Sequence, residues 1–227
     1  MIPGPIAIFD LDRTMHAGSG LGVLSRHAFR ANFISGERMA RSFVHDFVFR
    51  KGASTDGHIN SIAEFALEMG GGKSLHELEP IIEATTTEIV DSVRIPMMAV
   101  LELHRNAGHH CVLLSASPQH LVTRIAESLG FERGIGTVID VDDDGVLTGK
   151  IRQPMCYGEG KLERLTHEIG WPSSDGRSGS IASYAYADSM SDLPLLEAVE
   201  APFVVAPDRK LRQLAEERDW PVLDVRP

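Results

Sequence analysis

IAIFDLDRT, residues 6–14, is the stretch that decides the fold. Four apolar residues lead directly into two aspartates, Asp10 and Asp12, which are separated by one position. An apolar run of this length predicts a buried strand of a parallel sheet. Because side chains alternate along a strand, both carboxylates can point the same way where the strand ends. Converging buried carboxylates need a compensating charge, and a divalent cation that prefers oxygen ligands is the natural candidate.

The composition bounds the class of protein. A chain of 227 residues with 43% hydrophobic residues predicts one large domain, or one domain with a substantial insertion. The net charge of −10, without a run of lysines or arginines, argues against a nucleic-acid partner. Two cysteines, Cys111 and Cys156, are too few for a disulfide framework. No stretch approaches the ~18 apolar residues of a membrane span, so we expect a cytoplasmic protein whose oligomeric state the sequence leaves open.

Short apolar runs alternate with helical patterns after about residue 95. The apolar runs predict strands near residues 111–114, 137–139, 181–187 and 203–205, with a turn at 142–145 leading into a hairpin arm at 146–151. The helical patterns cover residues 97–106, 119–129, 161–169 and 211–218. This alternation predicts an α/β protein with a Rossmann-like parallel sheet core and helices on both faces.

Residues 17–94 do not follow this alternation. Their apolar residues have helical spacing throughout, and Phe29 and Phe33 are expected to form an i,i+4 pair on one helix. We therefore predict an all-helical insertion after the first strand.

Polar residues recur where the predicted strands end. Lys161 is expected to open a helix after a glycine-rich turn, which would let it reach the same edge of the sheet. In open α/β sheets this edge is where ligands bind. The carboxylates can hold a cation there, while a hydroxyl and the lysine can bind an oxyanion such as phosphate. The residues at, or just beyond, the predicted strand ends are Asp10, Asp12, Ser115, Asp188 and Asp192.

This order of motifs resembles the haloacid dehalogenase superfamily of phosphohydrolases. The matching segments are residues 10–14 (DLDRT), residues 113–117 (LLSAS), Lys161, and residues 188–194 (DSMSDLP). The helical insertion is similar to the cap of the phosphoserine-phosphatase-like branch. The resemblance implies an α/β catalytic core of residues 1–16 and 95–227 and a helical cap of residues 17–94.

The resemblance also implies roles for individual residues. Asp10 would attack phosphorus and become an aspartyl phosphate. Asp12 would act first as the general acid and then as the general base. Ser115 and Lys161 would bind the phosphoryl oxygens.

A magnesium ion is the cofactor that the resemblance implies. Its ligands would be Asp10, Asp188 and the backbone carbonyl of Asp12. Asp192 would support the water shell of the metal. Thr14 would fix the geometry of the loop.

The expected function is a magnesium-dependent phosphatase that hydrolyses a small phosphomonoester. The alternatives are a phosphotransferase of the same superfamily and a non-catalytic phosphate-binding protein with this fold. Phosphoserine phosphatases are expected to carry a glutamate shortly after the first motif, but residues 15–24 contain no acidic residue. This departure argues against L-phosphoserine as the substrate, and family precedent offers L-histidinol phosphate and phosphoserine analogues instead.

Overall fold

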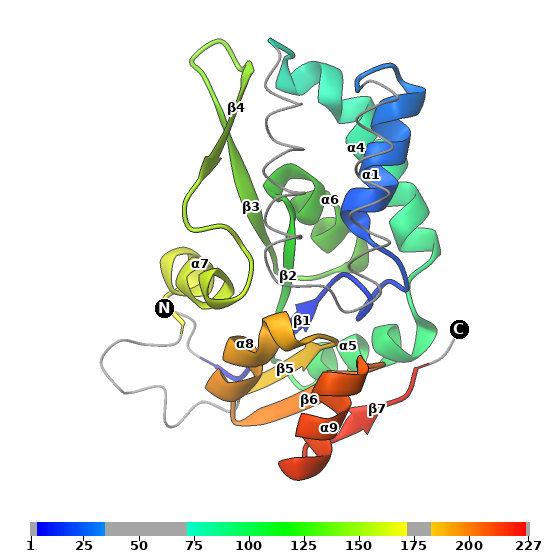
Figure 1. The fold of residues 1–227 in the computed structure, drawn as a ribbon, viewed down its shortest axis with the longest axis vertical. Coiled ribbons are helices and arrows are strands. Elements are labelled where there is room, and N and C mark those ends of the chain that lie inside the picture. The colour runs from blue at the N-terminus through cyan, green and yellow to red at the C-terminus, as the bar shows by residue number, and fades with distance from the viewer. Residues whose placement is uncertain (1–3, 35–71, 172–182, 226–227) are drawn as a thin grey trace.

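Strand β1 (Ile6–Asp10) lies at the centre of a seven-stranded sheet in the computed structural model, which describes residues 4–34, 72–171 and 183–225 (Figure 1). The strand order is β4-β3-β2-β1-β5-β6-β7. All neighbouring strands are parallel except β3 and β4, which form an antiparallel hairpin. The other strands are β2 (His110–Pro118), β3 (Arg133–Val141), β4 (Leu147–Arg152), β5 (Ser183–Ala187), β6 (Ala201–Val205) and β7 (Val222–Leu223).

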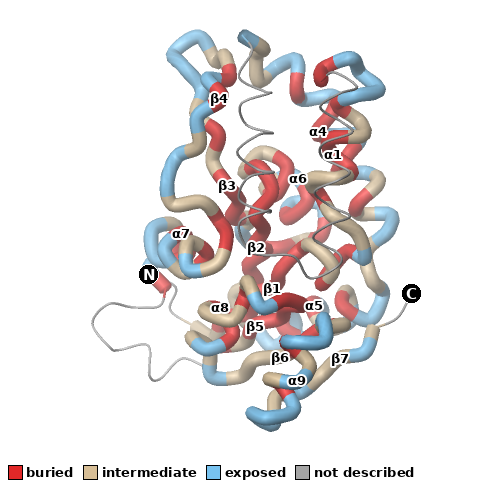
Figure 2. The backbone as a smooth tube through the Cα atoms, in the orientation of Figure 1, coloured by how far each residue is buried: buried red, intermediate tan, exposed pale blue. Residues whose placement is uncertain are grey.

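The alternation of side chains along β1 explains why helices cover both faces of the sheet. Ala7 and Phe9 share one apolar cluster with helices α1, α4, α5 and α6, whereas Ile6 and Ile8 share a second with α7, α8 and α9. Figure 2 shows the central strand β1 as buried. The predicted α/β architecture is confirmed. The helices are α1 (Gly20–Arg30), α4 (Leu75–Asp91), α5 (Ile95–Asn106), α6 (Gln119–Leu129), α7 (Glu159–Ile169), the 3-10 turn η2 (Met190–Asp192), α8 (Leu193–Ala198) and α9 (Arg209–Glu217).

The elements agree with the expected ones to within a few residues at most ends. The largest differences are at β3, which begins at Arg133 instead of near residue 137, and at β2, which continues to Pro118 instead of ending near Leu114. The short elements η2, α8 and β7 were not expected, because two to six residues carry too little pattern to be recognised. Residues 181 and 182 of the expected fourth strand lie outside the described residues.

The insertion after β1 begins and ends at neighbouring points of the backbone. The N–H of Arg94 donates a hydrogen bond of 2.8 Å to the carbonyl of Met15, and His16 and Val93 form an antiparallel bridge. The described parts of residues 17–94 contain two helices, α1 and α4, in agreement with a helical insertion. Residues 35–71 lie outside the described residues, so the proposed boundaries of the cap stay a prediction.

The expected pairing of Phe29 with Phe33 on one helix is wrong. Helix α1 ends at Arg30, and Asn32 takes a left-handed conformation with φ 55° that reverses the chain. The N–H of Phe33 then donates to the carbonyl of Ala28 at 2.7 Å. Phe33 is therefore buried in the core, while Phe29 stays 37% exposed.

Helix capping explains where α1 and α4 begin. The hydroxyl of Ser19 accepts a hydrogen bond of 3.2 Å from the N–H of Gly22 at the start of α1. Ser74 and Glu77 form a reciprocal capping box at the start of α4.

No helix among the described residues is long and apolar enough to cross a membrane.

Helix α5 provides a matched test of the core. Leu101 is fully buried on the side of α5 that faces the sheet, whereas Leu103 is 70% exposed. We expect Leu101→Ala to lower the free energy of unfolding by about 2–5 kcal/mol, because it removes buried methyl groups and leaves a cavity. The control Leu103→Ala should change it by less than about 0.5 kcal/mol. Urea denaturation measures both, and equal losses in the two variants would contradict this packing.

Candidate active site

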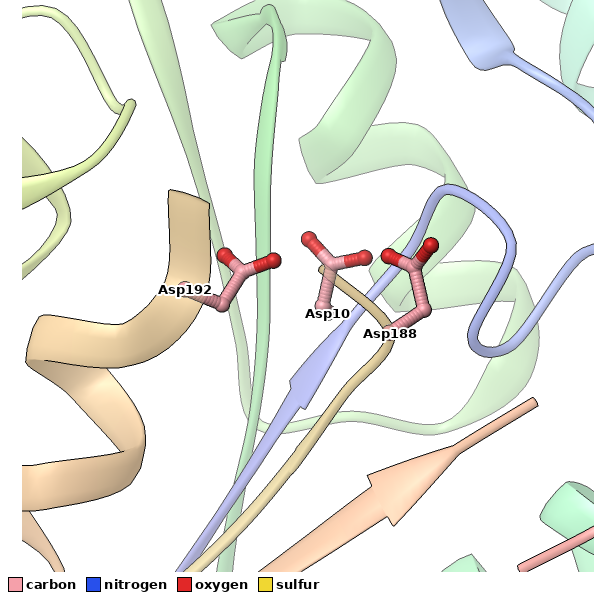
Figure 3. A group of neighbouring side chains, drawn as sticks. All are labelled: Asp10, Asp188 and Asp192. Atoms are coloured by element: carbon pink, nitrogen blue, oxygen red, sulfur yellow. The ribbon is translucent and has the colours of Figure 1, made fainter. Parts of the chain in front are cut away.

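Three carboxylates converge at the carboxyl edge of the sheet (Figure 3). Asp10 is the last residue of β1, Asp188 directly follows β5, and Asp192 is the last residue of η2. One oxygen from each carboxylate lies within 4.8 Å of the other two, and all three residues are buried. The structure thus brings together three of the predicted site residues that are far apart in the sequence.

Lys161 reaches these carboxylates from the first turn of α7. Its Nζ donates a hydrogen bond of 2.6 Å to Oδ1 of Asp10 and a second, shorter one to Oδ1 of Asp192. The turn before Lys161 is tight, because a Cβ on Gly160 would lie 2.0 Å from the carbonyl oxygen of Met155. Glycine at this position therefore lets α7 begin close enough for the lysine to enter the site.

Asp12 lies beside this group and uses different partners. Its Oδ1 accepts a hydrogen bond from the N–H of Gly20, and its Oδ2 accepts one of 3.0 Å from the hydroxyl of Ser115. A Cβ on Gly20 would lie 3.3 Å from Oδ1 of Asp12, so a larger residue would crowd the carboxylate. The first turn of α1 thus holds Asp12 from one side and β2 holds it from the other.

Ser115 was expected at the end of its strand or just beyond it, but it lies inside β2, which continues to Pro118. The pairing of β2 with β3 shifts register between Leu114 and Pro118, which frees this part of the strand from regular pairing. The hydroxyl of Ser115 also accepts a hydrogen bond of 3.1 Å from the N–H of Ser117. The position of Ser115 next to Asp12 is therefore set by an irregularity that its sequence does not reveal.

Thr14 is fully buried, and its hydroxyl makes no hydrogen bond to any of the described residues. Backbone hydrogen bonds hold the loop instead, including those from His16 N–H to Leu11 O at 3.0 Å and from Arg13 N–H to Gly18 O at 3.2 Å. The predicted role of Thr14 in fixing the loop stays a prediction.

The electrostatics of the site follow from burial. Burial raises the pKa of Asp10 to about 7, although the charge of Lys161 opposes this shift. Burial also raises the pKa of Asp188 well above its ordinary value, against the opposing charge of Arg13. Burial alone would lower the pKa of Lys161, but the carboxylates of Asp10 and Asp192 raise it well above its ordinary value. The carboxylates of this site therefore outnumber the basic residues, Lys161 and Arg13, that can neutralise them.

This donor set fits a magnesium ion. The carboxylates of Asp10, Asp188 and Asp192 are buried and close together, and hard oxygen ligands are what Mg²⁺ prefers. Asp192 is already held through both oxygens, by Lys161 and by the hydroxyl of Ser189 at 2.8 Å. The division of roles between Asp192 and the other two carboxylates stays a prediction.

A small pocket opens onto the carboxylates, and five of its lining residues were not predicted as site residues. Arg13 pairs with Asp188, with 2.8 Å between its Nε and Oδ2. Tyr157 and Ser191 are hydrogen-bonded to each other through their side chains. Two signals were available: Arg13 is a basic residue inside an acidic motif, and Tyr157 precedes Lys161 by four positions. The lining residues are Asp10, Asp12, Arg13, Ala116, Tyr157, Lys161, Asp188, Ser189, Ser191 and Asp192.

The motif order and this geometry agree with a family comparison. The model of the haloacid dehalogenase-like hydrolases matches residues 7–197. The chain belongs to this family. A probable phosphatase of Mycobacterium tuberculosis is 32% identical over 96% of this chain and 74% of its own length. A second protein of that organism, named phosphoserine phosphatase, is 29% identical over 97% and 70%. A histidinol-phosphatase of Neisseria meningitidis is 28% identical over 96% and 98%.

Solved structures of other proteins have a similar fold. A protein of unknown function from Bordetella pertussis has a TM-score of 0.83 and 26% identity, with 99% of this chain and 100% of that chain covered. A phosphoserine phosphatase with an analogue of its phospho-aspartyl intermediate has a TM-score of 0.68 at 15% identity, with 98% and 94% covered. The predicted superfamily and enzyme class, a phosphatase, are confirmed by the family match and the named relatives.

The raised pKa of Asp10 predicts a stability cost that depends on pH. Between pH 4 and 7 the folded chain keeps the Asp10 proton while the unfolded chain loses it, because the pKa rises from 3.8 to about 7 on folding. The metal-free protein should therefore lose stability over this range, and above pH 7 the full cost remains. We expect Asp10→Asn to be more stable than the wild type at pH 8 by on the order of 3 kcal/mol, and by much less at pH 4.

Urea denaturation in EDTA at the two pH values measures this difference. Asp143→Asn, in the exposed turn between β3 and β4, is the matched control and should show no such difference. An advantage of Asp10→Asn that is the same at both pH values would contradict the assigned cost.

Proposed function

We propose that this protein is a magnesium-dependent phosphatase that hydrolyses a small phosphomonoester through a phosphorylated Asp10. The observation that carries the proposal is the convergence of Asp10, Asp188 and Asp192 in the lining of one small pocket, where Lys161 is bound to Asp10 and Asp192. A protein that only needed this fold would have no physical reason to bury three carboxylates together, since each costs desolvation energy. The proposal is thus based on an arrangement that destabilises the fold but can perform chemistry.

Asp10 is suited to be the nucleophile. Its carboxylate lies at the end of a rigid central strand, and Lys161 holds one of its oxygens at 2.6 Å. In the proposed first step, the other oxygen attacks phosphorus, the bond from phosphorus to the ester oxygen breaks, and the alcohol leaves. A bound magnesium ion supplies positive charge that keeps Asp10 ionised and offsets the charge on the phosphoryl oxygens.

Asp12 is suited to move protons. It lines the same pocket as Asp10, and hydrogen bonds from Gly20 and Ser115 fix its carboxylate. In the proposed scheme Asp12 protonates the leaving alcohol in the first step. It then takes a proton from water, whose oxygen attacks phosphorus, releasing inorganic phosphate and free Asp10. Asp12 is thus ionised after the first step, when a base is needed, and protonated again after the second.

Ser115 and Lys161 are proposed to bind phosphoryl oxygens. Both are buried donors next to Asp12 and Asp10 respectively, and a charged donor in a low-dielectric site gives a strong hydrogen bond. The described half of the helical insertion, which includes α1, supplies the N–H that binds Asp12. We infer that residues 17–94 act as the cap, which excludes water and sets specificity.

The proposed substrate is a small alcohol phosphate. The named relatives include a phosphoserine phosphatase and a histidinol-phosphatase, whose substrates both carry an amino group. Residues 15–24 of this chain lack the glutamate that phosphoserine phosphatases are expected to carry, which argues against L-phosphoserine. L-histidinol phosphate is proposed instead because the histidinol-phosphatase is similar to this chain over 96% of its residues. The free, buried Cys111 and Cys156 support a location in the cytoplasm.

A panel of phosphomonoesters tests the reaction and its metal requirement. We expect phosphate release with Mg²⁺, and a loss of at least about a thousandfold in Asp10→Asn, because the nucleophile is removed. EDTA should abolish release, and Asp143→Asn should match the wild type. L-histidinol phosphate should be hydrolysed faster than L-phosphoserine. Phosphate transfer to added alcohols in place of release would favour a phosphotransferase, and magnesium binding without turnover would favour a binding protein.

Isotope labelling tests the covalent step. In a single turnover in H₂¹⁸O, attack by water on phosphorus places ¹⁸O in the phosphate and none in Asp10. With an aryl phosphate whose leaving group departs without protonation, a phosphorylated protein should accumulate in Asp12→Asn, because the first step then needs no acid while the second step still lacks its base. Mass spectrometry of the peptide that contains residue 10 measures this, with Asp143→Asn as the control. Direct attack by water would give labelled phosphate but no phosphorylated peptide in any variant.

A further inference from the structure

Arg13 is held in an uncommon conformation at the edge of the site. Its φ of 61° lies in the left-handed region, which residues other than glycine rarely adopt. Its N–H donates to the carbonyl of Gly18 at 3.2 Å, and its own carbonyl accepts from Nη2 of Arg94 at 3.4 Å. These contacts fix the backbone at both sides of the residue. The strained backbone directs the side chain into the pocket that Asp10 and Asp12 line.

The guanidinium of Arg13 forms an ion pair with Asp188, which is one of the carboxylates suited to bind a metal. Its Nε lies 2.8 Å from Oδ2 of Asp188, which is buried, while the side chain of Arg13 is 29% exposed. Lys161, by contrast, is buried and bound to both Asp10 and Asp192. Among the basic residues that line the pocket, Arg13 is therefore the more exposed one.

We propose that Arg13 couples metal binding to phosphate binding. Arg13 neutralises Asp188 in the metal-free protein, turns away from it when a cation takes the same carboxylate, and then donates to the phosphoryl oxygens of the substrate. The inference rests on the proposed function, because it needs both a metal and a phosphoryl group. Guanidinium groups bind carboxylate and phosphate with the same planar set of donors, so Arg13 can exchange one partner for the other.

The proposal differs from a purely structural ion pair in the signs of its effects. A guanidinium that shares Asp188 with a cation repels that cation and competes with it, so loss of the guanidinium charge should strengthen metal binding. The same loss should weaken phosphate binding, because a donor to the phosphoryl oxygens disappears. An ion pair that only supports the fold would weaken both or change neither.

Titration calorimetry on the whole protein separates these cases. The variants are Arg13→Gln, which removes the charge, and Arg13→Lys, which keeps it. The matched control is Arg212→Gln on α9, whose partner Asp224 is exposed. In the absence of phosphate, Arg13→Gln should bind Mg²⁺ about threefold to tenfold more tightly than the wild type.

Inorganic phosphate is the probe for the second effect. In saturating Mg²⁺, Arg13→Gln should bind phosphate on the order of tenfold more weakly, while Arg13→Lys should lie between Arg13→Gln and the wild type. Arg212→Gln should match the wild type in both titrations. By linkage, the factor by which Mg²⁺ strengthens phosphate binding should be smaller in Arg13→Gln than in the wild type.

Two results would overturn the proposal while leaving the proposed function intact. One is Mg²⁺ binding by Arg13→Gln that is unchanged or weaker, with a wild type that binds Mg²⁺. The other is phosphate binding that does not change in that variant. A wild type that binds no Mg²⁺ would instead contradict the proposed cofactor, and the coupling with it. Circular dichroism and thermal unfolding of each variant show that a change in affinity belongs to a folded protein.

Discussion

The rest of the site depends on the contact of one buried lysine with two buried carboxylates. Lys161 lies between Asp10 and Asp192 and donates to both. Removal of Lys161 would leave both buried carboxylates without their compensating charge, and breaking a buried ionic group in this way typically costs about 3–5 kcal/mol. The three residues come from the end of β1, the first turn of α7 and the turn η2. Their contact therefore fixes how three elements that are far apart in the sequence meet at one edge of the sheet.

The charge of this site is not balanced by the protein alone. Asp10, Asp12, Asp188 and Asp192 lie together with Lys161 and Arg13 as the basic residues of the same pocket. Part of the cost is relieved when Asp10 holds a proton near neutral pH. The fold thus accepts a local loss of stability, which the two large apolar clusters on either side of the sheet offset. Sites that favour chemistry over stability are expected to show this conflict.

The sequence was sufficient to predict the α/β fold and the convergence of Asp10, Asp188 and Asp192 at one edge of the sheet. The apolar run before Asp10 and the strand–helix alternation after residue 95 identify a parallel sheet, because both patterns report burial directly. The position of Ser115 inside β2 was not predictable, since it depends on a register shift between two strands. The contact of Arg13 with Asp188 was not predictable either. It depends on a left-handed backbone conformation at a residue that is not glycine. The turn at Asn32, which separates Phe29 from Phe33, has the same origin.

The adjacent ends of the helical insertion have an evolutionary consequence. The chain leaves the sheet near Met15 and returns at Arg94, where a backbone hydrogen bond joins the two points. The segment between these two points is a loop whose ends meet. The entropic cost of bringing the ends of a loop together grows only with the logarithm of its length. The length of chain between α1 and α4 could therefore change while these two helices still cover the sheet and the N–H of Gly20 still binds Asp12. Architectures of this kind can diversify what they recognise while the reacting groups stay in place.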